Sequence, residues 1–255
     1  MRRAGRRGLS SAAYGIVVLA LAACGSSPAG SAPTATSHTV TVLAAASLTE
    51  SFNRLTADFQ ATHPGITVAA SYGSSATLVQ QVNQGAPAQV IALAGEAAAE
   101  PLDTSLVKKS SIFASNVLEI AVPPDNPGGV HDINDLGRAG LKVVLCAETV
   151  PCGKAANATF KKARVVPSVV SREVDVKATL AKVKLGEADA AVVYHSDVVA
   201  ADGAVKGVPI RDPFNTSLRY PIITLADDAA TAEFVTYVLS AEGLATLQSF
   251  GLGAP

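Results

Sequence analysis

The chain has 255 residues, of which 49% are hydrophobic and 16% charged, with a formal net charge of −1. This length and apolar content fit one large or two modest α/β domains with a substantial core, and they argue against disorder over most of the chain. Lysines and arginines are scattered after the N-terminal segment, so the sequence offers no basic stripe for nucleic acid. Nucleic acid is therefore not an expected partner.

The N-terminal segment has the pattern of a secretory signal peptide over residues 1–23. Four arginines among the first seven residues precede the apolar run "AAYGIVVLALAA", and "LAAC" follows. The "LAAC" stretch resembles the lipobox of bacterial lipoproteins, which predicts that Cys24 becomes the lipid-modified first residue of the mature protein. The alternative is an ordinary signal peptide with an incidental cysteine.

Residues 24–38 are predicted to be a flexible, lipid-anchored tether. The stretch "GSSPAGSAPTATS" is rich in Gly, Ser, Pro and Thr and has no apolar period. No later segment approaches the roughly 20 continuous apolar residues that span a bilayer. We therefore expect an exported protein held by its lipid at the outer face of the cytoplasmic membrane.

Two cysteines remain after Cys24 is assigned to lipid. Cys146 and Cys152 form an even pair in an exported protein, where disulfides persist, so we predict a disulfide between them. A redox or metal role stays as the alternative. The spacing is wider than C-x-x-C and the four histidines are dispersed, which weighs against that role.

Strand-like and helix-like runs alternate from residue 39 onward. A buried strand is predicted at "TVTVLAA" (39–45), followed by a helix whose apolar residues recur at helical spacing from Leu48 to Phe59. The stretch "HPG" (63–65) ends that helix. Next come the strand "ITVAAS" (66–71), a short helix around residues 78–82 and the strand "QVIALA". This β-α-β-α-β order predicts a parallel sheet covered by helices on both faces.

A proline- and glycine-rich interruption near residues 119–124 indicates a domain boundary or hinge, and a second α/β set follows it. The predicted strands and helices of that set are "LKVVLC", "KAANATFKKA", "VVPSVV", "VKATLAKVKLG" and "ADAAVVY". The strand "YPIITLA" and the helices "AATAEFVTYVLS" and "AEGLATLQSFG" are too few for a third domain. We expect lobe 1 to comprise residues 39–120 and 197–255, and lobe 2 residues 121–196.

Candidate site residues lie where strands end and helices begin. In open parallel α/β sheets, ligands bind at the carboxyl ends of strands, where unpaired helix N–H groups point outward. The positions of this kind are Ser47, Ser75, Cys152, Val176 and Tyr194. Because they come from both parts of the chain, they are expected to converge on one cleft.

Each of these residues also has an ordinary structural explanation. Ser47 and Glu50 fit a capping box, in which the serine satisfies helix N–H groups and the glutamate reaches back. Ser75 fits an N-cap, and Asp175 fits the cap of the helix that opens at Val176. A lone tyrosine at a strand end is usually a packing residue, and the second cysteine of the pair is explained by its disulfide.

Several motifs together resemble the substrate-binding component of a molybdate ABC transporter. They are "VTVLAAASLTESF", "YGSSATLVQQVNQGAPA", "ETVPCGKAA", "VDVKATLAKVKLGEADAAVVYHSD" and "FVTYVLSAEGLATLQSFG". The resemblance covers nearly the whole chain after the tether, in the same order. It implies a two-lobed periplasmic-binding-protein fold of type II, with a mostly parallel sheet flanked by helices in each lobe and a ligand cleft between the lobes.

The resemblance also implies a function and a ligand set. Molybdate or tungstate would be bound by hydroxyl groups and backbone N–H groups of Ser47, Ser75, Cys152, Val176 and Tyr194. Molybdenum would thus be held as an oxyanion, with no protein side chain as a direct metal ligand and no cofactor. The implied partner is the membrane permease of an ABC importer, and the implied state is a monomer without enzymatic activity.

Two other classes of function remain as alternatives. One is a solute-binding lipoprotein for another anion such as sulfate or phosphate, for iron, or for an organic acid. Iron would require clustered tyrosines or carboxylates, and an organic acid would usually require an arginine fork. The other class is an exported hydrolase, since residues 105–108 match S-x-x-K, but the supporting K-T-G is absent.

Overall fold

The computed structural model describes residues 38–255. The predicted signal peptide, the predicted lipidation at Cys24 and the predicted tether up to residue 37 lie outside the described residues. His38, expected at the end of the tether, already belongs to the first strand. Among the described residues, no helix combines the length and apolar character that crossing a membrane requires.

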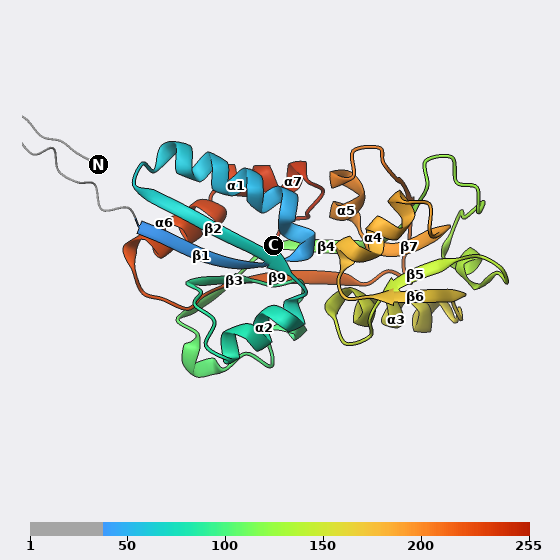
Figure 1. Ribbon diagram of the computed structural model, residues 1–255, viewed down its shortest axis with the longest axis horizontal. Coiled ribbons are helices and arrows are strands. Elements are labelled where there is room, and N and C mark those ends of the chain that lie inside the picture. Colours follow the sequence, from blue (N-terminus) through green and yellow to red (C-terminus); the bar gives the residue numbers. More distant parts are fainter. Residues whose placement is uncertain (1–37) are drawn as a thin grey trace, which may run out of the picture. The chain divides into compact units, whose positions relative to one another are not determined.

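Nine strands of the described residues form one continuous sheet, shown in Figure 1. The strand order is β2-β1-β3-β9-β4-β7-β5-β6, and β8 pairs with β4 beside this path. We call residues 109–117 of β4, together with β1, β2, β3 and β9, the first half of the sheet. Residues 118–122 of β4, together with β5 to β8, are the second half.

Three parallel strands and one antiparallel strand, together with the start of β4, build the first half. They are β1 (His38–Ala45), β2 (Ile66–Gly73), β3 (Val90–Ala92) and the antiparallel β9 (Ser217–Thr224). Its helices are α1 (Thr49–Thr62), α2 (Ser75–Asn83), α6 (Ala229–Val238) and α7 (Ala241–Ser249). Figure 1 shows α1 and α7 on one side of the sheet and α2 on the other.

The second half repeats the same plan. Its strands are the parallel β5 (Val143–Cys146), β6 (Val169–Glu173) and β7 (Ala190–Tyr194), together with β8 (Lys206–Pro209), and the end of β4 runs antiparallel to β7 and β8. Its helices are α3 (Pro151–Ala163), α4 (Val176–Lys184) and α5 (His195–Ala200). Short 3-10 helices complete the description: η1 (Ala46–Leu48), η2 (Glu96–Ala98), η3 (Thr104–Leu106) and η4 (Ile133–Gly137).

The 14-residue strand β4 (Lys109–Val122) joins the two halves. Its residues 109–117 pair with β9, and its residues 118–122 pair with β7 and β8. The sequence indicated only an interruption here, because the prolines and glycines that follow the strand dominate the pattern. The pairing of β8 with β4 also puts residues 206–209 in the second half, so the expected boundary at residue 196 does not coincide with the strand pairing.

The core explains why these sequences form these elements. In α1, Phe52, Leu55 and Phe59 recur at helical spacing and are fully buried. Phe59 packs edge-on against Phe234 of α6, with ring centroids 5.3 Å apart. The α/β class expected from the sequence, a sheet of mostly parallel strands flanked by helices, is thus confirmed. The strand expected at residues 165–170 begins later, at Val169, since Pro167 lies within the expected range.

Candidate functional site

A small cavity lies where the two halves of the sheet meet. Its volume, counted as space open to the centres of water-sized atoms, is about 20 Å³, somewhat more than the roughly 10–15 Å³ that one water needs. All five candidate residues from the sequence analysis line this cavity. Their contact with a ligand stays a prediction. The full lining is Ala45, Ala46, Ser47, Gly73, Ser74, Ser75, Ala94, Val150, Pro151, Cys152, Asp175, Val176 and Tyr194.

Several helices begin at this cavity. α2 starts at Ser75, α3 at Pro151 and α4 at Val176, and all three starting residues are in the lining. The first N–H groups of a helix have no partner within the helix, and its dipole is positive at that end. Pro151 has no N–H, so Cys152 supplies the first donor of α3. The convergence of these helix starts favours a negatively charged ligand.

The side chain of Ser47 has a different role from the capping role that the sequence pattern predicted. η1 and α1 have no side-chain cap at their starts, and Glu50 is engaged with Lys177 instead. Ser47 Oγ instead lies 3.1 Å from the hydroxyl of Tyr220 on β9, in a buried contact. The capping-box interpretation is therefore wrong, because both of its side chains have tertiary partners.

Ser75 likewise does not cap its helix. Ser74 occupies the N-cap position of α2, and Ser75 is the first helical residue. The Ser75 hydroxyl oxygen accepts a hydrogen bond from the backbone N–H of Ala94, at 2.9 Å. Because this contact uses the oxygen as an acceptor, the Ser75 proton is left to donate to a ligand in the cavity.

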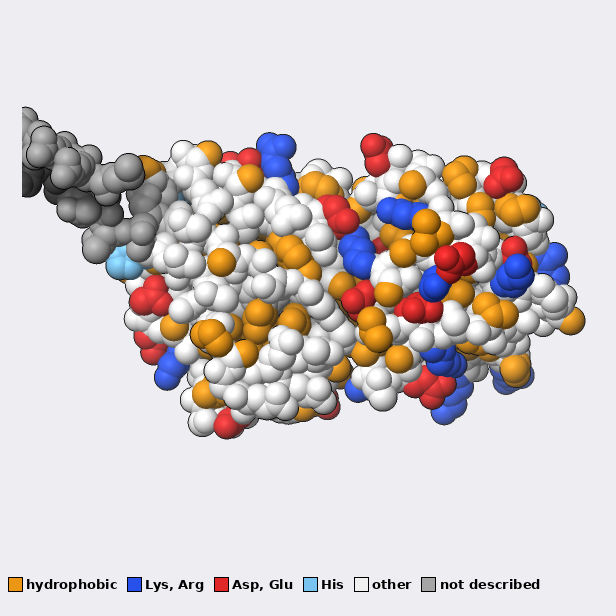
Figure 2. Space-filling model, in the orientation of Figure 1, with side chains coloured by type: hydrophobic (Ala, Val, Ile, Leu, Met, Phe, Trp, Pro, Cys, Tyr) orange, Lys and Arg blue, Asp and Glu red, His pale blue; other side chains and the backbone are white. Residues whose placement is uncertain are grey.

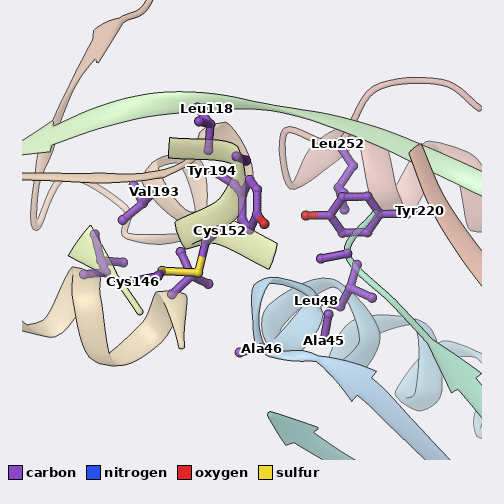
Figure 3. Packing of buried hydrophobic residues seen from close by; sticks show 14 of the residues in the cluster. Ala45, Ala46, Leu48, Leu118, Cys146, Cys152, Val193, Tyr194, Tyr220 and Leu252 are labelled. Carbon is purple, nitrogen blue, oxygen red and sulfur yellow. A yellow bond between two sulfur atoms is a disulfide. The ribbon is translucent and has the colours of Figure 1, made fainter. Parts of the chain in front are cut away.

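Two further hydroxyls at the cavity are buried and have no hydrogen-bond partner among the described residues: those of Ser74 and Tyr194. Buried polar groups are normally paired, and an exception calls for an explanation such as a ligand. Burial raises the pKa of Tyr194 well above its ordinary value, so the phenol stays protonated and remains a donor. Figure 3 shows its hydroxyl pointing toward that of Tyr220, whose ring centroid is 6.2 Å away.

The lining residues are nearly all uncharged. Asp175 is the exception, and its carboxylate accepts a hydrogen bond from the Ala178 N–H at 2.9 Å, which confirms the predicted N-cap of α4. Among these described lining residues there is no lysine or arginine. Any anion in the cavity would therefore be met by neutral donors and helix dipoles.

A charged cluster stands next to the cavity. Lys177, the second residue of α4, places its ammonium 2.6 Å from Glu50 of α1 and 3.1 Å from Asp197 of α5. Burial alone would lower the pKa of Lys177, but the carboxylates of Asp197 and Glu50 outweigh it and raise this pKa above its ordinary value. Burial raises the pKa of Asp197, which is fully buried, and the Lys177 ammonium opposes that shift. The Glu50–Lys177 contact links the two halves of the sheet.

The predicted disulfide between Cys146 and Cys152 is present, with the Cα atoms 5.8 Å apart. It ties the end of β5 to the first turn of α3, as Figure 3 shows. The bridge thus fixes the turn that carries the Cys152 N–H into the cavity.

We expect the double variant Cys146→Ala/Cys152→Ala to lose about 2 kcal/mol of unfolding free energy, because the bridge closes a short loop and so constrains the unfolded chain modestly. The measurement is chemical denaturation of both proteins. Reducing the wild type with a dithiol should produce a loss of similar size. An unchanged denaturation midpoint after either treatment would contradict the prediction.

No sequence pattern indicated Tyr220, Asn116 or Lys177 as residues near the site. Both Tyr220 and Asn116 are buried, but they stand beside Arg219 and Ser115, so neither is an isolated polar residue in an apolar run. The partners of Lys177 come from distant parts of the chain, so no local pattern reveals them.

Within residues 38–255, no three or more His, Cys, Asp and Glu side chains form a group that could hold a metal ion. On the face in Figure 2, side chains of both charge signs are interspersed over the second half.

Comparisons with known proteins agree with this architecture. A family model described as "Bacterial extracellular solute-binding protein" matches residues 40–253. The molybdate-binding protein ModA of Mycobacterium tuberculosis (strain ATCC 25618 / H37Rv) is 34% identical over 250 residues, covering 94% of this chain and 95% of that protein.

Two solved structures show the same fold. The periplasmic molybdate-binding protein of Azotobacter vinelandii has a TM-score of 0.74 at 19% identity, covering 85% of this chain and 99% of that one. The sulfate-binding protein SubI from Mycobacterium tuberculosis H37Rv has a TM-score of 0.76 at 19% identity, covering 84% and 86%. The fold is therefore common to a protein named for molybdate and one named for sulfate.

Proposed function

Because this chain belongs to the bacterial extracellular solute-binding protein family, we propose that it captures molybdate or tungstate in the cavity between the halves of its sheet and delivers the anion to the permease of an ABC importer. The observation that carries the proposal is the cavity itself, where helix starts and neutral hydroxyls converge without a lysine or arginine in the described lining. A 34% identical relative named for molybdate supports the choice of anion.

The donor set fits a fully ionised tetrahedral oxyanion. Such an anion offers only acceptors, while Ser47, Ser75 and Tyr194 supply hydroxyls and Cys152 and Val176 supply N–H groups at helix starts. Hydrogen bonds to a charged group contribute about 1.5–3 kcal/mol each. Several such hydrogen bonds together offset the free-energy costs of desolvating the anion and of closing the lobes, and the remainder is sufficient for tight binding.

We place the lobe boundaries within β4 and at the start of β9. Lobe 1 would comprise residues 38–117 and 217–255, and lobe 2 residues 118–216, because β4 passes from the first half to the second and the chain is back in the first half where β9 begins. Closure about these segments is a hinge transition. The Glu50–Lys177 ion pair would add to the contacts of the closed form. The signal peptide over residues 1–23, the lipid on Cys24, the tether and the monomeric state belong to the same proposal.

The test is isothermal titration calorimetry of the full chain in detergent micelles with molybdate, tungstate, sulfate and phosphate. We expect one-to-one binding of molybdate and tungstate and much weaker binding of the other two. Ser47→Ala and Ser75→Ala should each weaken molybdate binding by about 10- to 100-fold, since each removes a hydrogen bond to a charged ligand.

The matched control is Ser105→Ala, an exposed serine of η3 that belongs to the S-x-x-K stretch. Its affinity for molybdate should equal that of the wild type. Equal affinity for sulfate and molybdate would support the alternative of a binding protein for another oxyanion. Hydrolysis of an ester substrate that Ser105→Ala abolishes would favour the exported hydrolase.

A further inference from the structure

Ser47 is one end of a buried chain of hydrogen bonds that leads away from the cavity. Its hydroxyl oxygen lies 3.1 Å from the hydroxyl of Tyr220 on β9. The side-chain amide of Asn116 on β4 lies 3.3 Å from the same Tyr220 hydroxyl and 2.8 Å from the hydroxyl of Ser196 on α5. All four side chains are at most 5% exposed. The chain therefore connects the cavity with β9 and with β4, the strand that crosses between the halves.

The direction of these hydrogen bonds follows from Asn116. Its Oδ1 accepts the backbone N–H of Val117 at 3.0 Å, which fixes the orientation of the amide. The amide nitrogen on the other side can only donate, and it has two protons. One proton goes to Ser196 and the other to Tyr220.

Either hydroxyl could be the donor of the Ser47–Tyr220 contact, and the amide of Asn116 favours donation by Tyr220. Because the Tyr220 oxygen accepts from Asn116, its own proton is free to be donated to Ser47 Oγ. Burial raises the pKa of Tyr220 above its ordinary value, so the phenol keeps this proton at neutral pH. With Tyr220 as the donor of this pair, Ser47 Oγ accepts, and the Ser47 proton is left for an acceptor in the cavity.

We propose that Tyr220 is a positioning residue that holds Ser47 as a hydrogen-bond donor toward the bound oxyanion. The inference rests on the proposed function, and it assigns to Tyr220 a role in binding without contact with the anion. Ser75 is set in the same way by the Ala94 N–H, so both serines present a proton to the ligand. Hydrogen bonds in such chains polarise one another, which strengthens the last donor.

The test is a double-mutant cycle on molybdate affinity, measured by titration calorimetry on the full chain. Tyr220→Phe keeps the ring and removes only the hydroxyl. We expect it to weaken binding by about 5- to 10-fold, the size of one hydrogen bond. In the Ser47→Ala background the same substitution should change affinity by less than about 2-fold, because Tyr220 acts through Ser47.

The control is Tyr237→Phe on α6, whose hydroxyl contacts Glu242 at 3.4 Å. It should bind molybdate as the wild type does. A purely structural role for Tyr220 would weaken binding equally in both backgrounds, and that result would overturn the inference. Unchanged affinity of Tyr220→Phe would overturn it too. Failure of the wild type to bind any anion would instead refute the proposed function.

A second variant covers the case in which Tyr220→Phe does not fold. Asn116→Ala leaves both hydroxyls in place and removes the donor that sets their direction. It should weaken molybdate binding by about 2- to 5-fold when Ser47 is present and have no effect in the Ser47→Ala background. A loss independent of Ser47 would contradict the proposed relay.

Discussion

Lys177→Met is expected to lower the free energy of unfolding by about 3–5 kcal/mol at neutral pH, because it leaves a buried carboxylate without its cation. Asp197 is fully buried, and its remaining protein donor is the Tyr194 N–H at 3.1 Å. The hydrocarbon of methionine replaces the stem of the lysine, so the loss reports mainly the missing charge. The measurement is chemical denaturation at several pH values.

The pH dependence distinguishes this cause from lost packing. In the variant, the pKa of Asp197 lies even further above its ordinary value, since the Lys177 charge no longer opposes burial and only the Tyr194 N–H still does. The folded protein takes up a proton on Asp197 more readily than the unfolded chain does. The deficit relative to wild type is therefore absent below the pKa of the unfolded chain and develops as the pH rises through the folded pKa. We expect a smaller deficit at about pH 5 than at about pH 8.

The matched control lies on the same helix. Lys182 also contacts a carboxylate at 2.6 Å, that of Glu187, but the pair is exposed. Lys182→Met should change stability little, because water screens an exposed pair. Equal losses for Lys177→Met and Lys182→Met, or a deficit at position 177 that does not vary with pH, would contradict the assigned role of Asp197.

Gly153→Ala is expected to lower unfolding free energy by at least about 3 kcal/mol and to abolish tight molybdate binding. A Cβ atom at this position would overlap the carbonyl oxygen of Ala147 and would lie 2.8 Å from that of Cys146. Both obstacles are backbone atoms, which cannot rotate aside. The turn between β5 and α3 would have to move, and the Cys152 N–H would move with it.

The control for this prediction is Lys154→Ala, the next residue of α3, whose side chain is exposed. It should leave thermal stability and affinity close to wild type, since alanine suits a helix. Thermal unfolding and titration calorimetry on both variants provide the measurements. A Gly153→Ala protein with wild-type stability and affinity would show that the turn tolerates displacement.

The elements with strong periodicity were predictable. α1 follows from apolar residues at helical spacing, and the parallel strands of each half follow from short apolar runs before helices. The five candidate residues meet at one cavity because strand ends gather at the same edge of a sheet. The disulfide followed from an even pair of cysteines in an exported protein.

Features that depend on distant partners were not predictable. Ser47 and Glu50 match a capping box locally, yet the Ser47 side chain contacts Tyr220 and the Glu50 side chain contacts Lys177. A local pattern competes with tertiary contacts that lie 173 and 127 residues away along the chain, and those contacts prevail. The same holds for β4, whose length is set by two sets of pairing strands rather than by its own sequence.

The way β4 crosses between the halves and the chain returns to the first half at β9 also bears on when each half can complete its strand pairs during synthesis. Every strand pair of the second half lies within residues 118–209, so that half can complete its sheet as soon as this stretch has emerged. β3 and the start of β4 must wait for β9, near the end of the chain. The pairs of β1 with β2 and β3 also lie early, within residues 38–92, so what waits for residues 217–224 is the closing of the first half through β9.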